Sequence, residues 1–342
     1  MQKKQATLFQ ALLPILVLIA LLTLNVTVFG SDAIGGANQI VLLLAAGVAG
    51  LVAWQLGYTY TEINDSIVRS ISSAMSAIII LLTIGSLSGT WLLSGIVPAM
   101  IYYGIKILNP TIFLFAACVV SAIVSVATGS SWSTIATVGI ALLGIGQALD
   151  ISEGVVAGAI ISGAYFGDKM SPLSDTTNLA PAMAGTDLFT HIRYMAYTTM
   201  PSLIITLVIF LIWGFTFDTS ASQTDSSAVL TALEASFNLS PLLFIVPVLV
   251  IVMIIKRVPA APALLIGALL GGLFAVIFQP QVINQVSGID GNYLKSSFVA
   301  VMNALSTTIQ VKTDDAQINE LLTGKGMYGM LNTVWLIICA MI

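Results

Sequence analysis

Long continuous apolar runs limit this chain to one class of fold. They are long enough to cross the roughly 30 Å hydrocarbon core of a bilayer, and they lie at Leu8–Phe29, Gln39–Trp54, Ile71–Leu93, Tyr197–Phe217 and Ala260–Phe278. A transmembrane β-barrel would instead need strands of about ten residues in which apolar and polar residues alternate. Charged residues make up only 8% of the chain, against about 25% in soluble domains. The sequence therefore predicts an all-α polytopic membrane protein whose first partner is the lipid bilayer.

The composition also excludes several functions. The net charge is −4 and no basic stripe is present, which argues against nucleic acid as a partner. We find no phosphate-binding loop, metal-ligand cluster or nucleophile–base pair, so we expect neither an enzyme nor a protein with a bound cofactor. The two cysteines, Cys118 and Cys339, both lie in apolar runs and predict no disulfide.

Basic residues predict the orientation in the membrane, because they gather in cytoplasmic loops. Lys3 and Lys4 place the N-terminus in the cytoplasm, and the turn at Lys256 lies on the same side. The loop 58–69 is predicted inside, whereas the acidic segment 217–240, which has no Lys or Arg, is predicted outside. We expect a multi-pass protein of the cell membrane.

Two parts of the chain look alike but are predicted in opposite orientation. "LPILVLIALL" at Leu13 and "LLLAAGVAGLVAW" at Leu42 resemble "VPVLVIVMII" at Val246 and "LLIGALLGGLFAV" at Leu264. Weak similarity with reversed flanking charge is typical of inverted-topology repeats. We therefore expect a first repeat at 1–217, an external linker at 218–240 and a partial second repeat at 241–342.

The first repeat needs one net crossing between its third and last spans. Its expected elements are helices 8–29, 39–54 and 71–93, a re-entrant hairpin at 110–149, a broken helix at 153–184 and a helix at 197–217. This count leaves Ser94–Leu108 as an interfacial segment and puts Lys106 on the side that the charge rule disfavours.

Polar residues interrupt the apolar sequence at "TGSSWST", residues 128–134. Unpaired backbone groups cost several kcal/mol each in hydrocarbon, so such a break needs protein or water around it. Ser133 or Thr134 could cap the second helix, while free carbonyls at the end of the first helix could face a cation. The alternative is that small residues only let two helices approach closely. The candidate residues at the tip are Thr128, Ser130, Ser131 and Ser133.

A second break, "GDKMSPLSDTTN" at residues 167–178, concentrates more charge. Asp168 would lie at the end of a half-helix, beside electronegative carbonyls, and oxygen ligands of this kind suit a small hard cation. We expect Asp168 and Asp175 to bind Na⁺. The hydroxyl residues expected to assist them are Ser171, Ser174, Thr176 and Thr177. The alternative is an ordinary loop outside the membrane, in which Lys169 and Asp175 form a solvated pair.

A carboxylate at membrane depth is disfavoured in its charged form, so H⁺ and Na⁺ can compete for it. Such competition, with access switching between the two sides, is sufficient for ion exchange. Lys169 offers a second way to couple the ions, by pairing with Asp168 or Asp175 when no cation is bound.

The motifs "TGSSWSTIATVGIALLGIGQAL" and "GAIISGAYFGDKMSPLSDTTNLAPAMAGTDLFTHIRYM" resemble the NhaC family of sodium/proton antiporters. The resemblance extends from about Ile71 to the end of the chain. It implies inverted repeats, Na⁺/H⁺ exchange by alternating access, and a homodimer. It also implies functional positions, which are Thr128, Gly129, Ser130, Ser131 and Ser133 in the tip, and Asp168, Ser171, Pro172, Ser174, Asp175, Thr176 and Thr177 in the broken helix.

Two further expectations follow from the resemblance. Some members of the family exchange sodium and lactate for protons and malate, and the hydroxyl-rich tip could equally hold a carboxylate. The chain also ends in an apolar run at Ile342 without a second "TGSSWST" or "SPLSDTT" after Ser240, so we expect it to be incomplete at its C-terminus. A channel or a non-transporting membrane scaffold is the alternative from another class.

Overall fold

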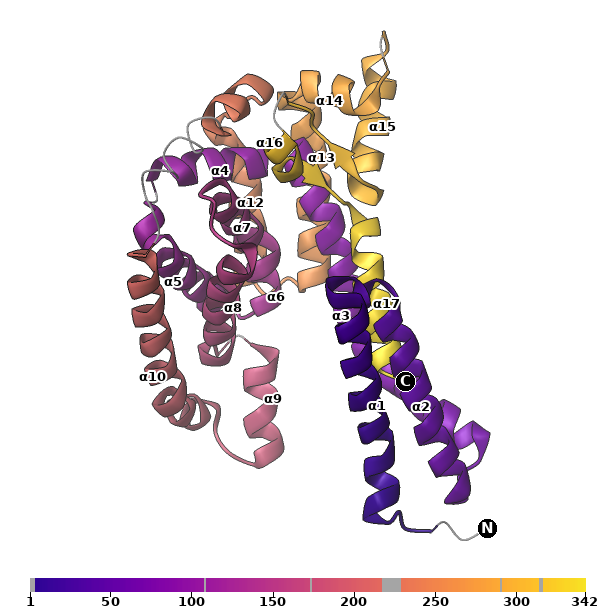
Figure 1. Ribbon diagram of the computed structural model, residues 1–342. Coiled ribbons are helices and arrows are strands. Elements are labelled where there is room, and N and C mark those ends of the chain that lie inside the picture. The colour runs from indigo at the N-terminus through magenta and orange to yellow at the C-terminus, as the bar shows by residue number, and fades with distance from the viewer. Residues whose placement is uncertain (1–3, 108, 173, 217–228, 290, 314–315) are drawn as a thin grey trace. The chain divides into compact units, whose positions relative to one another are not determined.

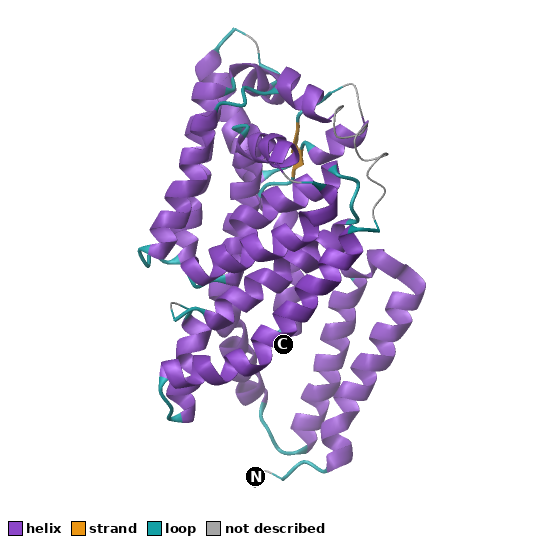
Figure 2. Ribbon diagram, turned by 90° about the vertical axis from the view of Figure 1, so that its left-hand side faces the viewer, coloured by secondary structure: helices purple, strands orange, loops and turns teal. Residues whose placement is uncertain are grey.

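A computed structural model describes the chain except for residues 1–3, 108, 173, 217–228, 290 and 314–315 (Figure 1). The side chains of residues 31, 175, 178–179, 182–183 and 316–317 also lie outside the described part. The described residues are mostly helical, with one pair of short strands (Figure 2). They form two compact units, Met1–Leu82 with Tyr328–Ile342, and Thr83–Met327.

Seven helices among the described residues are long and apolar enough to cross a membrane. They are α1 (Leu8–Phe29), α2 (Ala37–Gln55), α3 (Tyr60–Leu93), α5 (Pro110–Thr128), the continuous run Ser131–Ala148, α10 (Leu188–Gly214) and α13 (Ala260–Phe278). A bent pair, Val229–Ser236 with Pro241–Ile255, would be an eighth, although its two parts meet at 92°. The predicted class, an all-α polytopic membrane protein, is confirmed.

The first unit contains α1, the 3-10 turn η1 (Gly30–Gly35), α2, the start of α3 and α17 (Leu331–Ala340). Its buried cluster joins Ile78 and Leu81 of α3 to Val334 of α17. Gln39, which is fully buried, donates from Nε2 to the carbonyl oxygens of Ile34 and Asn332, at 2.9 and 3.5 Å. The Gln39 contacts tie α17 to the turn between α1 and α2.

The segment 58–69, which the sequence predicts as a loop, is largely helical. Helix α3 begins at Tyr60 and not at Ile71. Thr59 and Glu62 form a capping box there, since the Thr59 amide donates to Glu62 Oε2 at 2.9 Å and the Glu62 amide donates to Thr59 Oγ1 at 3.4 Å. The 34 residues of α3 correspond to about 51 Å, so this helix is longer than the hydrocarbon is thick. The extra length accommodates the charged residues of this segment, which lie in the first turns of the helix.

The second unit carries both breaks that the sequence analysis identified. Its elements up to Gly214 are the end of α3, α4 (Ile96–Ile107), α5, α6 (Ser131–Thr134), the π-turn η2 (Ile135–Gly139), α7 (Ile140–Ala148), α8 (Glu153–Met170), α9 (Asp175–Ala184) and α10. Those that follow the bent segment are η3 (Pro241–Phe244), α12 (Ile245–Ile255), α13, α14 (Pro280–Ser287), α15 (Tyr293–Ser306), β1 (Ile309–Gln310), α16 (Ala316–Leu321) and β2 (Thr323–Gly324). The strands pair antiparallel, with Ile309 opposite Gly324.

The residues 229–240, predicted as part of an external linker, are folded. A helix covers Val229–Ser236, and its Leu233 is fully buried while Val229 and the following Phe237 are nearly so. These apolar residues recur every four positions, which is the spacing of one helix face. The side of the membrane on which this segment lies stays a prediction.

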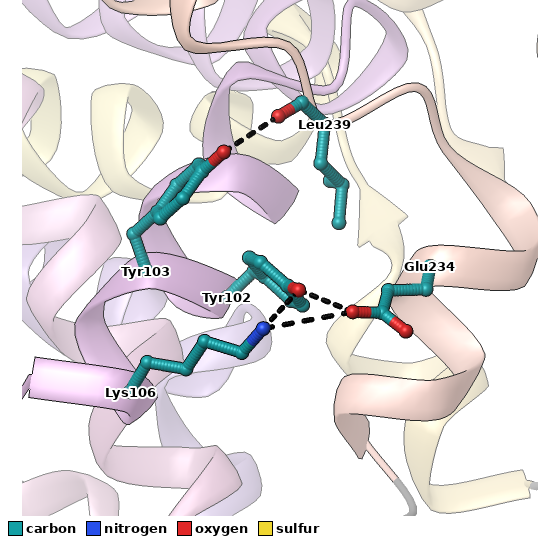
Figure 3. A network of polar contacts seen from close by, with 5 residues as sticks. All are labelled: Tyr102, Tyr103, Lys106, Glu234 and Leu239. Atoms are coloured by element: carbon teal, nitrogen blue, oxygen red, sulfur yellow. Dashed lines mark hydrogen bonds and ion pairs between the residues drawn. The ribbon is translucent and has the colours of Figure 1, made fainter.

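Polar contacts fasten this segment to α4 (Figure 3). Tyr102 donates to the Glu234 carboxylate and accepts from Lys106 Nζ, which also lies 3.6 Å from Glu234 Oε1. Tyr103 donates to the carbonyl oxygen of Leu239 at 3.1 Å. The hydrogen bond to Tyr102, together with the charge of Glu234, raises the pKa of Lys106 above its ordinary value. Lys106, the residue that violates the charge rule, thus has a carboxylate partner.

A glutamine fixes the corner between α3 and α4. Gln279 is 2% exposed, and its Nε2 donates to the carbonyl oxygens of Ser94 at 3.1 Å and Asn238 at 2.9 Å. Gly95 has a φ of +78°, and a Cβ there would lie 2.3 Å from Gln279 Nε2. Only glycine accepts both that backbone conformation and that contact. The predicted interfacial segment Ser94–Leu108 is therefore mostly a short helix with buried residues, folded against the rest of the unit.

Candidate functional site

The hairpin tip is a helix end followed at once by a helix start. Helix α5 ends at Thr128, and Gly129 adopts the left-handed conformation at φ +70° that closes many helices. Ser130 then caps the next helix, because its Oγ accepts from the Ser133 amide at 3.2 Å. The sequence "TGS" thus turns the chain within two residues and leaves hydroxyls on both sides of the turn.

The hydroxyls of the tip bond to one another and to the backbone. Thr128 Oγ1 and Thr134 Oγ1 lie 3.3 Å apart. Thr134 Oγ1 donates to the carbonyl oxygen of Ser130 at 2.9 Å, and Ser133 Oγ donates to Ser130 Oγ at 3.2 Å. Thr128, Ser133 and Thr134 are buried. This network joins the residues on the two sides of the turn.

The second break separates α8 from α9. Helix α8 ends at Met170, and Ser174 caps α9 by accepting from the Thr177 amide at 3.4 Å. Thr177 Oγ1 reaches back to the carbonyl oxygens of Asp168 and Lys169, at 3.0 and 3.2 Å. A helix end leaves its last carbonyls without intrahelical donors, and Thr177 supplies one. The sequence "SDTT" therefore starts the new helix and also closes the old one.

The two breaks meet at the first aspartate of the second motif. Ser131 Oγ donates to Asp168 Oδ2 at 3.0 Å, and Ser171 Oγ donates to the carbonyl oxygen of Val126, near the end of α5, at 2.7 Å. Ser131 and Ser171 are buried and Asp168 is half-buried. The structure thus places a carboxylate against the hairpin tip although 37 residues separate Ser131 from Asp168.

Close packing of α5 on α8 brings these groups together. A Cβ at Gly163 would lie 2.0 Å from the carbonyl oxygen of Cys118, and one at Gly167 would lie 2.5 Å from that of Ala122. Ser125 Oγ donates to the carbonyl oxygen of Ala164 at 2.5 Å, between these two glycines. Small residues that let backbones touch are typical of helix interfaces in membranes. Here the structure combines that interface with the polar site, which the sequence analysis had treated as alternatives.

The predicted residues do not all join this cluster. Lys169 and Thr176 are exposed, and Thr176 Oγ1 lies 3.0 Å from Ser174 Oγ. No ion pair between Lys169 and Asp168 is present in the described residues, which include both side chains. The side chain of Asp175 lies outside the described part, so its prediction as a ligand stays a prediction.

Thr134, expected as a possible helix cap, instead donates to the carbonyl oxygen of Ser130. The sequence analysis did not name Ser125, whose hydroxyl bonds across the packed interface between α5 and α8, which we call the seam. Its signal was present in the spacing, because Ser121, Ser125 and Thr128 recur at four and three residues on one face of α5. Small polar residues on such a face also occur in ordinary helix packing, and spacing alone does not separate the two uses.

The arrangement suits a small cation better than covalent chemistry. It offers a carboxylate, several hydroxyls and backbone carbonyls, the oxygen ligands that hard cations prefer. No group of three His, Cys, Asp or Glu side chains that could hold a metal occurs among the described residues.

Comparisons with known proteins identify relatives of this chain. Residues 163–341 match the Na⁺/H⁺ antiporter family. A malate-2H⁺/Na⁺-lactate antiporter of Bacillus subtilis is 39% identical over 333 residues, 97% of this chain and 67% of its own length. An uncharacterized Na⁺/H⁺ antiporter of Haemophilus influenzae is 34% identical over 345 residues, 99% of this chain and 69% of that protein. The Na⁺/H⁺ antiporter NhaC of Alkalihalophilus pseudofirmus is 41% identical over 240 residues, 70% of this chain and 51% of that protein.

This chain thus spans about two thirds of the length of the first two relatives and about half of the third. No solved structure matches it.

Proposed function

Because this chain belongs to the Na⁺/H⁺ antiporter family, we propose that it is a secondary active transporter that exchanges Na⁺ for H⁺ across the cytoplasmic membrane. The family identified from the motifs is confirmed, and its members are transporters and not enzymes. The proposed mechanism is alternating access, with Na⁺ and H⁺ competing for Asp168 and Asp175. Inverted repeats, a cytoplasmic N-terminus and a homodimer belong to the same proposal.

One observation carries the site assignment. The hydrogen bond from Ser131 Oγ to Asp168 Oδ2 joins the hairpin tip to the helix break at 3.0 Å. A hydroxyl that donates to a carboxylate keeps its own oxygen lone pairs available to a cation. Ser131 and Asp168 can therefore contact one Na⁺ together. Protonation of Asp168 removes the negative charge that attracts the ion, and this is the competition that exchange requires.

Exchange by purified protein in proteoliposomes tests the proposal. A Na⁺ gradient should drive proton movement, recorded with a pH-sensitive dye trapped inside the vesicles. Asp168→Asn should abolish this signal, because asparagine has the shape of aspartate but neither its charge nor its titration. Asp187→Asn is the matched control, because the asparagine oxygen can still accept the hydrogen bond that Asp187 Oδ2 receives from the Thr190 amide at 3.0 Å.

Normal exchange by Asp168→Asn would refute the site assignment. Asp175→Asn, measured in the same way, tests the second carboxylate. Titration of Na⁺ into the protein at two pH values should also release protons, and more of them at the lower pH, where more of the site is protonated.

A second candidate function has an observation of its own. The B. subtilis relative named for malate and lactate covers 97% of this chain at 39% identity. A carboxylate substrate could accept a hydrogen bond from the hydroxyl of Ser130, whose Oγ is only an acceptor in its bonds with Ser133. Uptake of labelled malate driven by a lactate gradient distinguishes the two candidate functions. A Na⁺/H⁺ exchanger would move protons but would take up no malate.

A further inference from the structure

A cavity of about 520 Å³ lies in the second unit, beside α7. Small-molecule sites in proteins occupy roughly 300–1,000 Å³, so this space is far larger than a packing defect. Five parts of the second unit contribute to it, namely the end of α3, α4, α7, the start of α8 and the segment β1–α16–β2. Helix α16 is in contact with α7, and both helices lie in the second unit (Figure 1). We call this cavity the vestibule.

One face of α7 lines the vestibule. The residues Ile140, Leu143 and Gln147 recur at three and four positions, and all three are half-buried. The opposite face of the helix is packed, since a Cβ at Gly146 would lie 2.5 Å from Val156 of α8. Helix α7 therefore packs against α8 on one side and lines the vestibule on the other.

The vestibule runs from exposed charged residues to a buried apolar floor. Glu153, Glu320 and Lys325 are exposed, whereas Ile101 is fully buried and Leu92 is 4% exposed. This change from exposed charged residues to buried apolar residues is expected of an opening that leads inward from an aqueous surface. Non-helical backbone, like that of β1 and β2 here, is tolerated in a membrane protein where it is buried in protein or lines water.

Ile140 is the residue of α7 that lines the vestibule nearest to the hairpin tip along the helix. Ile140 follows Ser133 by seven residues, which is about 10 Å along a helix. Glu153, at the outer end, precedes Asp168 by fifteen residues of α8, or about 22 Å. The vestibule thus covers roughly the outer half of the distance from the surface to the site.

The charges at the opening favour cations. Two carboxylates, Glu153 and Glu320, face one ammonium, that of Lys325, and Gln147 Nε2 holds Glu153 Oε1 by a hydrogen bond. A cleft with net negative charge raises the local concentration of cations and repels anions. An organic carboxylate would have to pass both glutamates.

We propose that the vestibule is the aqueous route by which a monovalent cation reaches the hairpin tip from one side of the membrane. This inference rests on the proposed Na⁺/H⁺ exchange and assigns it an access path. The access path can be tested separately from transport, because the measurement is the rate at which reagents reach a cysteine and not the movement of ions.

The test measures how fast charged thiol reagents reach the vestibule. Cys118 and Cys339 are replaced by alanine, and Leu143→Cys then places one thiol on the lined face of α7. Leu142→Cys is the matched control, because Leu142 is 5% exposed and does not line the vestibule. Cationic and anionic methanethiosulfonates of similar size are compared in low-salt buffer, in which charges act over a long range. Leu143→Cys should react, faster with the cationic reagent, and Leu142→Cys should not.

Changes of charge at the opening should shift this preference in opposite directions. Removing one charge about 10 Å from the path changes each rate about twofold in water, and the ratio of the two rates about fourfold. Glu320→Gln should therefore lower the ratio of cationic to anionic rate, and Lys325→Gln should raise it.

Three results would overturn the inference. They are no reaction at Leu143→Cys, a faster reaction with the anionic reagent, and a ratio of cationic to anionic rate that is unchanged by both Glu320→Gln and Lys325→Gln. In any of these cases loss of exchange in Asp168→Asn would still support the transport function. The opposite outcome is also possible to observe: the vestibule prefers the cationic reagent, but the protein does not exchange Na⁺ for H⁺. That outcome would support the access route and refute the transport proposal.

Discussion

Gly163→Ala should push α5 away from α8, because the new Cβ would lie 2.0 Å from the carbonyl oxygen of Cys118 and 2.9 Å from the amide nitrogen of Ala122. The shorter distance falls about 1.5 Å short of the roughly 3.5 Å at which non-bonded heavy atoms pack favourably, so the helices must separate by more than about 1 Å. Both obstacles are backbone atoms, which cannot rotate aside as a side chain can. The substitution should also weaken the site, since a 1 Å shift exceeds what the 3.0 Å bond between Ser131 and Asp168 tolerates.

The expected cost follows from two opposing effects. Overpacking of a tight interface costs about 1–3 kcal/mol, and the better helix propensity of alanine returns up to about 1 kcal/mol. A net destabilisation of about 1–2 kcal/mol results. Gly158→Ala and Gly154→Ala on the same helix meet nothing within 4 Å, so they keep the gain without the cost and should be neutral or slightly stabilising.

Thermal unfolding of the purified protein in detergent, followed by circular dichroism, measures the difference. The midpoint of Gly163→Ala should fall below that of wild type, and the midpoints of the two controls should not. The reasoning is refuted if Gly163→Ala is as stable as Gly158→Ala, because the seam would then have room for a methyl group.

Two further predictions concern single hydrogen-bonded groups. Ser131→Ala should weaken Na⁺ binding, measured by titrating Na⁺ into the purified protein, because the site loses a hydroxyl oxygen beside the Asp168 carboxylate. Ser131→Thr, which keeps a hydroxyl, should restore most of the binding in the same measurement. The contacts of Lys106 with Tyr102 and Glu234 raise its pKa, so their contribution to stability is complete below the unfolded value of 10.5 and is lost as the pH rises through the raised folded value. Wild type should therefore lose its advantage over Glu234→Gln in thermal scans only above about pH 10.5, and equal sensitivity of both proteins across this range would contradict the assignment.

The sequence carries much of the information on the second unit, because its helix ends depend on local signals. Asn109 caps α5 by accepting from the Thr111 amide at 3.0 Å, and Pro110 occupies its first turn. Gly129 ends the same helix. Such signals act within a few residues, and a reader of the sequence finds them without knowing the fold.

In the segment 58–69 the charged residues predict a loop, but a capping box at Thr59, which is a local signal that the sequence analysis overlooked, starts a helix there. Other elements follow from contacts that no local pattern reveals. The folding of 229–240 depends on Glu234 meeting Lys106 and on Gln279 meeting Asn238, partners 128 and 41 residues away. Partners so far apart in the sequence meet only when the chain folds, so the periodicity of the sequence cannot predict their contacts.

The candidate site divides in the same way. The hydroxyls of the tip and the carboxylate of Asp168 stand out in the sequence because polar groups are costly among apolar runs. Their pairing through Ser131 depends on the seam between Gly163 and Cys118. A glycine in an apolar run has several uses, and only the packed helices show which one applies.

The hydroxyl of Thr177 bears on the unloaded half of an exchange cycle. An ion exchanger must return through the membrane at times without the metal ion that its oxygens would coordinate. Two carbonyls at the broken end of α8 would then be bare in a medium of low polarity, but Thr177 donates to both of them, and Ser171 does the same for Val126. In the proposed exchange, these hydroxyls would give the carbonyls a donor during the steps in which no metal ion is carried.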